Sequence, residues 1–76
     1  METLNLSKEN IIELFNNGTT VKKCCGLWNN PRTNNTIVRS TNDIETFYKW
    51  ASMVEVKQYD GDTSIYLHGY SSGDMF

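Results

Sequence analysis

Residues 54–70 read VEVKQYDGDTSIYLHGY, and this segment carries the strongest structural signal in the chain. Aliphatic and polar residues alternate on both sides of an Asp-Gly pair, which is typical of two β-strands joined by a tight turn. A two-residue loop at that pair sets Val56 opposite Ile65. The next pair on the same face is then Val54 with Leu67, so the segment predicts a β-hairpin with one apolar face.

The opposite face of this hairpin would carry three of the four tyrosines in the chain. The residues that alternate with the aliphatic ones are Glu55, Lys57, Tyr59, Ser64, Tyr66, His68 and Tyr70. We expect the aliphatic side chains to pack beneath helices and the phenol rings to point outward into solvent. A recognition surface on this face depends on those rings being exposed.

Two helices are predicted, one near the start of the chain and one directly before the hairpin. Ser7 is the expected N-cap of a helix over residues 8–17, and Gly18 follows its end as a residue of left-handed conformation. Asn42 is the expected cap of the second helix, because Glu45 three residues later approximates a capping box. The narrow apolar stripe of this second helix consists of Ile44, Phe47, Tyr48 and Ala51, with Trp50 beside it.

A further pair of strands is expected between the two helices. Residues 19–28 are rich in β-branched residues and cysteine, and residues 36–40 give a short return strand. The connection over residues 29–36 consists almost entirely of turn-forming residues. Lys23 interrupts the alternation of apolar residues in the first of these strands, so its facing is ambiguous from the sequence.

The order of these elements predicts a single α+β domain over residues 1–70. We expect a small two-layer sandwich of αββαββ order, with a four-stranded, mainly antiparallel sheet and two helices on one face. A fifth short strand at residues 2–6 would give the alternative, a ferredoxin-like βαββαβ arrangement. Residues 71–76 are expected to form a flexible C-terminal tail. At an offset of 33 residues, Ser7, Ile11, Leu14, Phe15 and Val21 align with Ser40, Ile44, Phe47, Tyr48 and Val54.

Composition disfavours several classes of partner. The net charge is −2, and the seven Lys and Arg residues are scattered among nine acids, so no basic surface for nucleic acid is indicated. No apolar run approaches the roughly 20 residues of a membrane span. The segment METLNLSKEN lacks a signal-peptide pattern, so we expect a cytoplasmic protein, in a bacterial host if a phage encodes it.

The two cysteines indicate neither a disulfide nor a metal site. Cys24 and Cys25 are adjacent, and Cα atoms about 3.8 Å apart are too close for an ordinary bridge. Their spacing is a poor zinc signature, and no cofactor is predicted. We expect Cys25 to pack as a small apolar group and Cys24 to be half exposed. A nucleophile–base pair of Cys24 with His68 is conceivable, but with one histidine and no phosphate-binding loop the chain is not expected to be an enzyme.

Elimination leaves a surface for binding another protein. The expected function is that of a small stoichiometric inhibitor or regulator of a larger host protein, of the kind encoded by bacterial viruses or mobile elements. One alternative is a self-associating homodimer, and another is a weak single-stranded nucleic-acid binder that uses the aromatic sheet face. The loop over residues 29–36 is a second candidate contact. The residues expected to contact a partner are Trp28, Arg32, Trp50, Tyr59, Tyr66, His68 and Tyr70.

Overall fold

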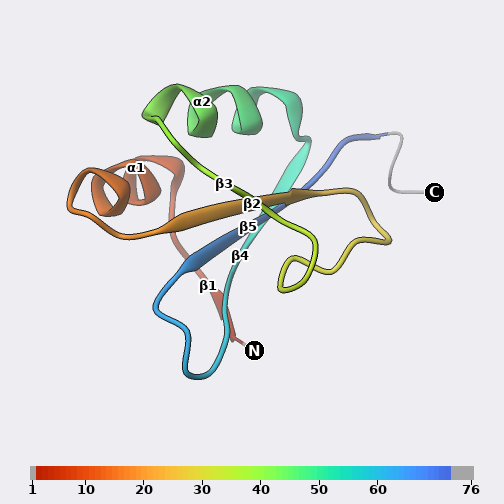
Figure 1. The fold of residues 1–76 in the computed structure, drawn as a ribbon. Coiled ribbons are helices and arrows are strands. Elements are labelled where there is room, and N and C mark those ends of the chain that lie inside the picture. The colour runs from red at the N-terminus through yellow and green to blue at the C-terminus, as the bar shows by residue number, and fades with distance from the viewer. Residues whose placement is uncertain (1, 73–76) are drawn as a thin grey trace.

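Two helices cover one face of a five-stranded sheet in the computed structural model, which describes residues 2–72 (Figure 1). This arrangement confirms the predicted two-layer α+β sandwich. The elements in chain order are β1 (Glu2–Leu4), α1 (Lys8–Asn16), β2 (Val21–Cys25), β3 (Thr36–Ile37), α2 (Thr41–Trp50), β4 (Met53–Gln58) and β5 (Ile65–Tyr70).

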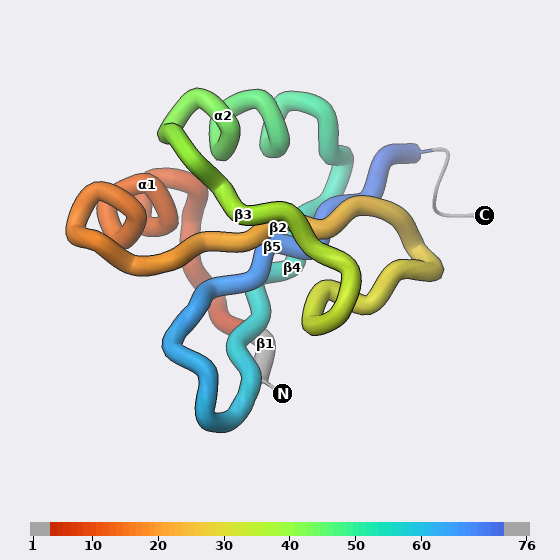
Figure 2. The backbone as a smooth tube through the Cα atoms, viewed as in Figure 1, coloured from red at the N-terminus to blue at the C-terminus, as the bar shows by residue number. Residues whose placement is uncertain are grey.

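The sheet has the strand order β1-β4-β5-β2-β3. β2 pairs with β5 in parallel, and the other three pairings are antiparallel, so the sheet is mainly antiparallel as predicted. The backbone in Figure 2 shows β5 running between β2 and β4. The fifth strand at residues 2–4 exists, but it lies at an edge beside β4. Between residues 2 and 72 the order is therefore βαββαββ, one strand more than the ferredoxin-like alternative.

The first helix begins at Lys8, as its sequence predicts, and ends at Asn16, one residue before the predicted end. Ser7 is the N-cap: its hydroxyl accepts a hydrogen bond from the Asn10 amide at 3.2 Å, and the Asn10 side chain accepts one from the Ser7 amide. At the other end Gly18 has φ +99°, and the Thr19 amide donates to the Leu14 carbonyl at 3.0 Å. This pattern is a Schellman motif, which satisfies carbonyls that the helix end would otherwise leave unpaired.

The second helix begins earlier than the prediction, which was wrong about its cap. Ser40 is the N-cap, and its amide and that of Arg39 both donate to the Asp43 carboxylate, at 3.3 and 2.9 Å. Ser40 and Asp43 form a capping box of the kind that was expected for Asn42 and Glu45, two residues later in the chain. The 33-residue alignment already placed Ser40 opposite Ser7, and both residues are caps.

The hairpin has the predicted facing but a different register. Val56 lies opposite Leu67 instead of Ile65, a shift of two residues that keeps every side chain on its expected face. The shift arises because Asp62 lengthens the turn: its carboxylate accepts from the Ser64 amide at 2.8 Å, which holds residues 62–64 out of the ladder. Gly61 has φ +78°, as an Asp-Gly turn requires.

The core lies between the helices and the sheet. Phe47 packs against β5 at Gly69, which makes room for it, because a Cβ on Gly69 would lie 2.5 Å from the Phe47 Cζ. The buried residues of this cluster are Ile11, Val21, Val38, Ile44, Phe47, Val56, Ile65 and Leu67. Of the predicted tail, residues 73–76 lie outside the described part of the chain.

Candidate functional site

The residues predicted to bind a partner fall into two groups. The exposed group is Trp28, Arg32 and Trp50. The buried group is Tyr59, Tyr66, His68 and Tyr70, whose exposed fractions lie between 3% and 7%. Only the first group is available to a partner on the surface of the fold.

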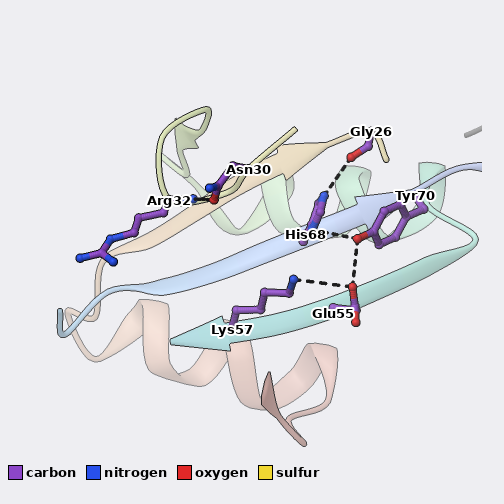
Figure 3. Close-up of polar contacts among 7 residues, drawn as sticks. All are labelled: Gly26, Asn30, Arg32, Glu55, Lys57, His68 and Tyr70. Atoms are coloured by element: carbon purple, nitrogen blue, oxygen red, sulfur yellow. Dashed lines mark hydrogen bonds and ion pairs between the residues drawn. The ribbon is translucent and has the colours of Figure 1, made fainter. Parts of the chain in front are cut away.

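The prediction that the tyrosine rings point into solvent was wrong, although their face was assigned correctly. Figure 3 shows His68 and Tyr70 on the face of the sheet turned away from the helices. The segment over residues 26–36 folds back across this face. Its Arg32 guanidinium lies 5.3 Å from the centroid of the Tyr59 ring, and its Pro31 is buried. A nucleic-acid base therefore finds no open stacking platform here, which removes the surface invoked for that alternative.

A polar chain fixes the covering segment to the sheet (Figure 3). His68 Nε2 lies 2.9 Å from the Gly26 carbonyl, and Nδ1 lies 2.9 Å from the Tyr70 hydroxyl, which donates to Glu55 Oε1 at 3.0 Å. A carbonyl only accepts, so Nε2 is the donor in the bond to Gly26. Lys57 Nζ lies 3.9 Å from the same Glu55 oxygen.

The titration of Tyr70 reflects this environment. Burial, together with the hydrogen bond to Glu55, raises the pKa of Tyr70 to about 12. A neutral phenol is therefore maintained well above the pH at which a free tyrosine ionises. The chain from Gly26 to Glu55 is fully hydrogen-bonded within the fold, which is how a buried polar network stabilises one conformation.

A second polar cluster ties the turn of the hairpin to the same face. The Tyr66 hydroxyl donates to Asp62 at 2.5 Å, and Lys22 Nζ lies 3.5 Å from that hydroxyl. The bond to Asp62 raises the pKa of Tyr66, and the same bond lowers the pKa of the Asp62 carboxyl. The Tyr66 ring also meets Tyr59 edge to face, with centroids 4.9 Å apart. These contacts give Tyr66 a structural role.

The two cysteines have the opposite exposure to the one expected. Cys24 is buried and Cys25 is exposed. Cys24 lies beside His68 across the parallel pairing, but the ring nitrogens of His68 face the Gly26 carbonyl and the Tyr70 hydroxyl. Burial raises the pKa of the Cys24 thiol, which disfavours the thiolate that a nucleophile needs. The geometry of this pair gives no support to catalysis.

Exposed apolar side chains gather at one end of the sheet. β2 and β5 end there and β4 begins there, because Cys25 pairs with Gly69 and Met53 pairs with Tyr70. Trp28 is 91% exposed, which is extreme for an indole. We call this the apolar end surface, and its residues are Leu27, Trp28, Trp50 and Met53.

A pocket of about 390 Å³ opens beside the apolar end surface, between β2, α2 and the segment over residues 26–36. β2 contributes Lys23 and Cys25 to its lining, and α2 contributes Phe47 and Trp50. We call it the α2 pocket. The sequence held a signal for it, because Lys23 occupies an inward position among apolar residues. Lys23 lines the pocket together with Phe47 and Trp50 of α2.

Metal binding and membrane insertion find no support in the described residues. Within residues 2–72, no three His, Cys, Asp or Glu side chains are grouped so that they could hold a metal ion. In the same range neither helix has the length and apolar character needed to cross a bilayer.

No protein-family model, no curated protein and no solved structure matches the chain. The surfaces of the chain itself are therefore the basis for assigning it a function. Two of them are distinctive: the apolar end surface and the α2 pocket that adjoins it.

Proposed function

We propose that this chain is a small non-catalytic module that binds a larger protein through the apolar end surface, acting as a stoichiometric inhibitor or regulator. The observation that carries the proposal is the exposure of Trp28, 91% of whose surface is open to solvent. Two free cysteines fit a reducing compartment, so we place the encounter in the cytoplasm.

Energetics favour this surface over the tyrosine face. Trp28 and Trp50 expose indoles within one end of the fold, and tryptophan is among the residues most enriched at binding hot spots. Met53 adds a flexible apolar side chain that adapts to the shape of a partner. Covering such residues removes apolar area from water, which is worth about 25 cal/mol per Å² before the costs of association.

The test compares variants that leave the fold intact. The protein is tagged ahead of β1, which pairs with the far end of β4 from Met53, and is used to capture proteins from a lysate of the organism that encodes it. Trp28→Ala should lose the captured protein, because truncating a hot-spot tryptophan costs about 2–4 kcal/mol of binding. Ile37→Ala is the control, since Ile37 is an exposed apolar residue on β3, outside the end surface.

Two outcomes would overturn the proposal. One is a stoichiometric partner that both variants retain equally, which would place the contact elsewhere. The other is a purified chain that sediments as a dimer and becomes a monomer in Trp28→Ala. The apolar end surface would then join two copies of this chain, and the homodimer alternative would replace the larger partner.

A further inference from the structure

The α2 pocket combines an apolar floor with a single positive charge. Phe47 and Trp50 supply the floor, with ring centroids 5.8 Å apart. Among the lining residues that the structure describes, Lys23 is the only charged one, although acids outnumber bases in the whole chain. Within residues 2–72, the Lys23 ammonium has no carboxylate within 4.0 Å and no hydrogen-bond partner. Among these residues its charge therefore has no direct ion pair or hydrogen bond.

The carboxylate whose pKa this charge influences already has other partners. The pKa of Asp43 is lowered mainly by its hydrogen bond from the Arg39 amide, and Lys23 contributes at longer range. Asp43 caps α2 and does not line the pocket. Within the described part of the chain, an incoming anion therefore competes with no direct ion pair for Lys23.

We propose that the α2 pocket binds an apolar organic anion, a carboxylate carried on an aromatic or branched aliphatic body. The body packs against Phe47 and Trp50, and the carboxylate accepts hydrogen bonds from the Lys23 ammonium. A volume of about 390 Å³ lies within the range of small-molecule sites, which are mostly apolar with a few placed polar groups.

The wall opposite α2 is held in place before any ligand arrives. The side-chain amide of Asn29 donates to the Cys25 carbonyl, and that of Asn34 donates to the Asn29 side chain at 2.8 Å. The amide of Asn35 donates to the Pro31 carbonyl at 2.8 Å. A wall tied down in this way loses little conformational freedom on binding, which favours affinity.

The structure supplies two reporters of occupancy. Both cysteines line the pocket, but Cys25 is exposed and Cys24 is buried, so a neutral alkylating reagent should react at Cys25 first. Trp50 also lines the pocket, and a Trp28→Phe background leaves it as the only indole. Neither reporter depends on a protein partner, so this test can fail while the proposed function stands, and the reverse also holds.

The probes are N-acetyl-phenylalanine and its uncharged carboxamide, which have the same apolar body. A ligand of this size should bind with a dissociation constant on the order of 1 mM. At about 5 mM the acid should slow alkylation of Cys25 by iodoacetamide about sixfold and change Trp50 fluorescence. The amide should slow the alkylation less than about twofold. Cys25→Ser identifies the reacting thiol.

The lysine is tested with a matched pair of variants. Lys23→Met keeps most of the apolar stem and should abolish the difference between acid and amide. Lys49→Met removes an exposed lysine of α2 that does not line the pocket, and it should behave as the wild type. A short peptide that ends in phenylalanine with a free carboxylate distinguishes two sources of the natural ligand. If the peptide protects Cys25 from alkylation, the ligand is the C-terminal end of a partner protein. If N-acetyl-phenylalanine alone protects Cys25, the ligand is a small molecule.

Three results would overturn the proposal. The first is the absence of any protection or fluorescence change with the acid. The second is equal protection by acid and amide, which would remove the charge from recognition. The third is unchanged protection in Lys23→Met, which would place the bound carboxylate away from that ammonium.

Discussion

The contact between Gly69 and Phe47 gives the sharpest test of how the helices pack on the sheet. In Gly69→Ala the added Cβ would lie 2.5 Å from Phe47 Cζ, 2.8 Å from Cε2 and 3.3 Å from the Ala51 Cβ. Carbon atoms in contact prefer about 3.5–4.0 Å, so the ring must move by about 1 Å. Phe47 is buried and packs against Trp50, and its displacement would disturb the whole floor of the α2 pocket.

The expected magnitude combines two opposite effects. Gly69 has no positive φ, so alanine suits the strand and should gain roughly 0.5–1 kcal/mol through the unfolded state. Overpacking of a core costs about 1–3 kcal/mol. We expect a net loss of about 1–2 kcal/mol, a large part of the roughly 3–5 kcal/mol that a core of this size supplies. Each kcal/mol of lost stability lowers the melting temperature of a domain this size by about 4–8 °C, so the melting temperature should fall by about 5–15 °C.

The assay is urea and thermal unfolding followed by circular dichroism and tryptophan fluorescence. Phe47→Leu removes the atoms that clash, so the double variant with Gly69→Ala should be at least about 1 kcal/mol more stable than the sum of the single changes. A Gly69→Ala variant as stable as the wild type would refute the packing described here. Strict additivity with Phe47→Leu would do the same.

Three other perturbations test the caps, the turn and the buried network. Ser40→Ala should lower the free energy of unfolding in urea by about 1 kcal/mol, whereas Asn42→Ala should change it by less than about 0.5 kcal/mol. A larger loss in Asn42→Ala than in Ser40→Ala would indicate that Asn42 is the N-cap after all. Gly61→Val should cost about 1–2 kcal/mol because valine resists φ +78°, while Gly61→Asn should stay nearer the wild type; equal losses would point to a cause other than the backbone. Folding stabilises the neutral form of Tyr70, because the pKa of Tyr70 rises from 10.0 to about 12 in the folded state. The contribution of this shift to the stability of the fold is therefore complete below about pH 10 and is lost as the pH rises toward 12. The stability gap between wild type and Tyr70→Phe should therefore narrow over that interval in urea unfolding, and a constant gap would contradict the raised pKa.

Facing was predictable from the sequence because it depends only on alternation. Val56 and Leu67 lie under the helices, and Tyr66 lies on the other side, as the pattern of residues 54–70 required. Register was not predictable in the same way. The side chain of Asp62 accepts a hydrogen bond from the Ser64 amide, and the strand pairing is shifted by two residues. A shift of two residues leaves every side chain on the same face, so the alternation of the sequence cannot reveal it.

The exposure of the tyrosine face depended on information that local patterns lack. The path of residues 26–36 is a tertiary property, and nothing in a run of turn-forming residues says which face of the sheet it will cover. Arg32 was expected to contact a partner. It is exposed, but its guanidinium lies over the Tyr59 ring of its own chain. The α2 pocket was missed for the same reason, since it exists only where that segment, β2 and α2 meet.

The central position of β5 has a consequence for biosynthesis. β5 is the last strand in the described chain, every residue of it is buried, and it joins β4 to β2. A nascent chain lacking this strand would hold two separate halves, β1 with β4 and β2 with β3, with no ladder between them. The ribosome must therefore release residues 65–70 before the sheet can assemble, and a peptide spanning β5 added to the preceding fragment should reconstitute the fold in trans.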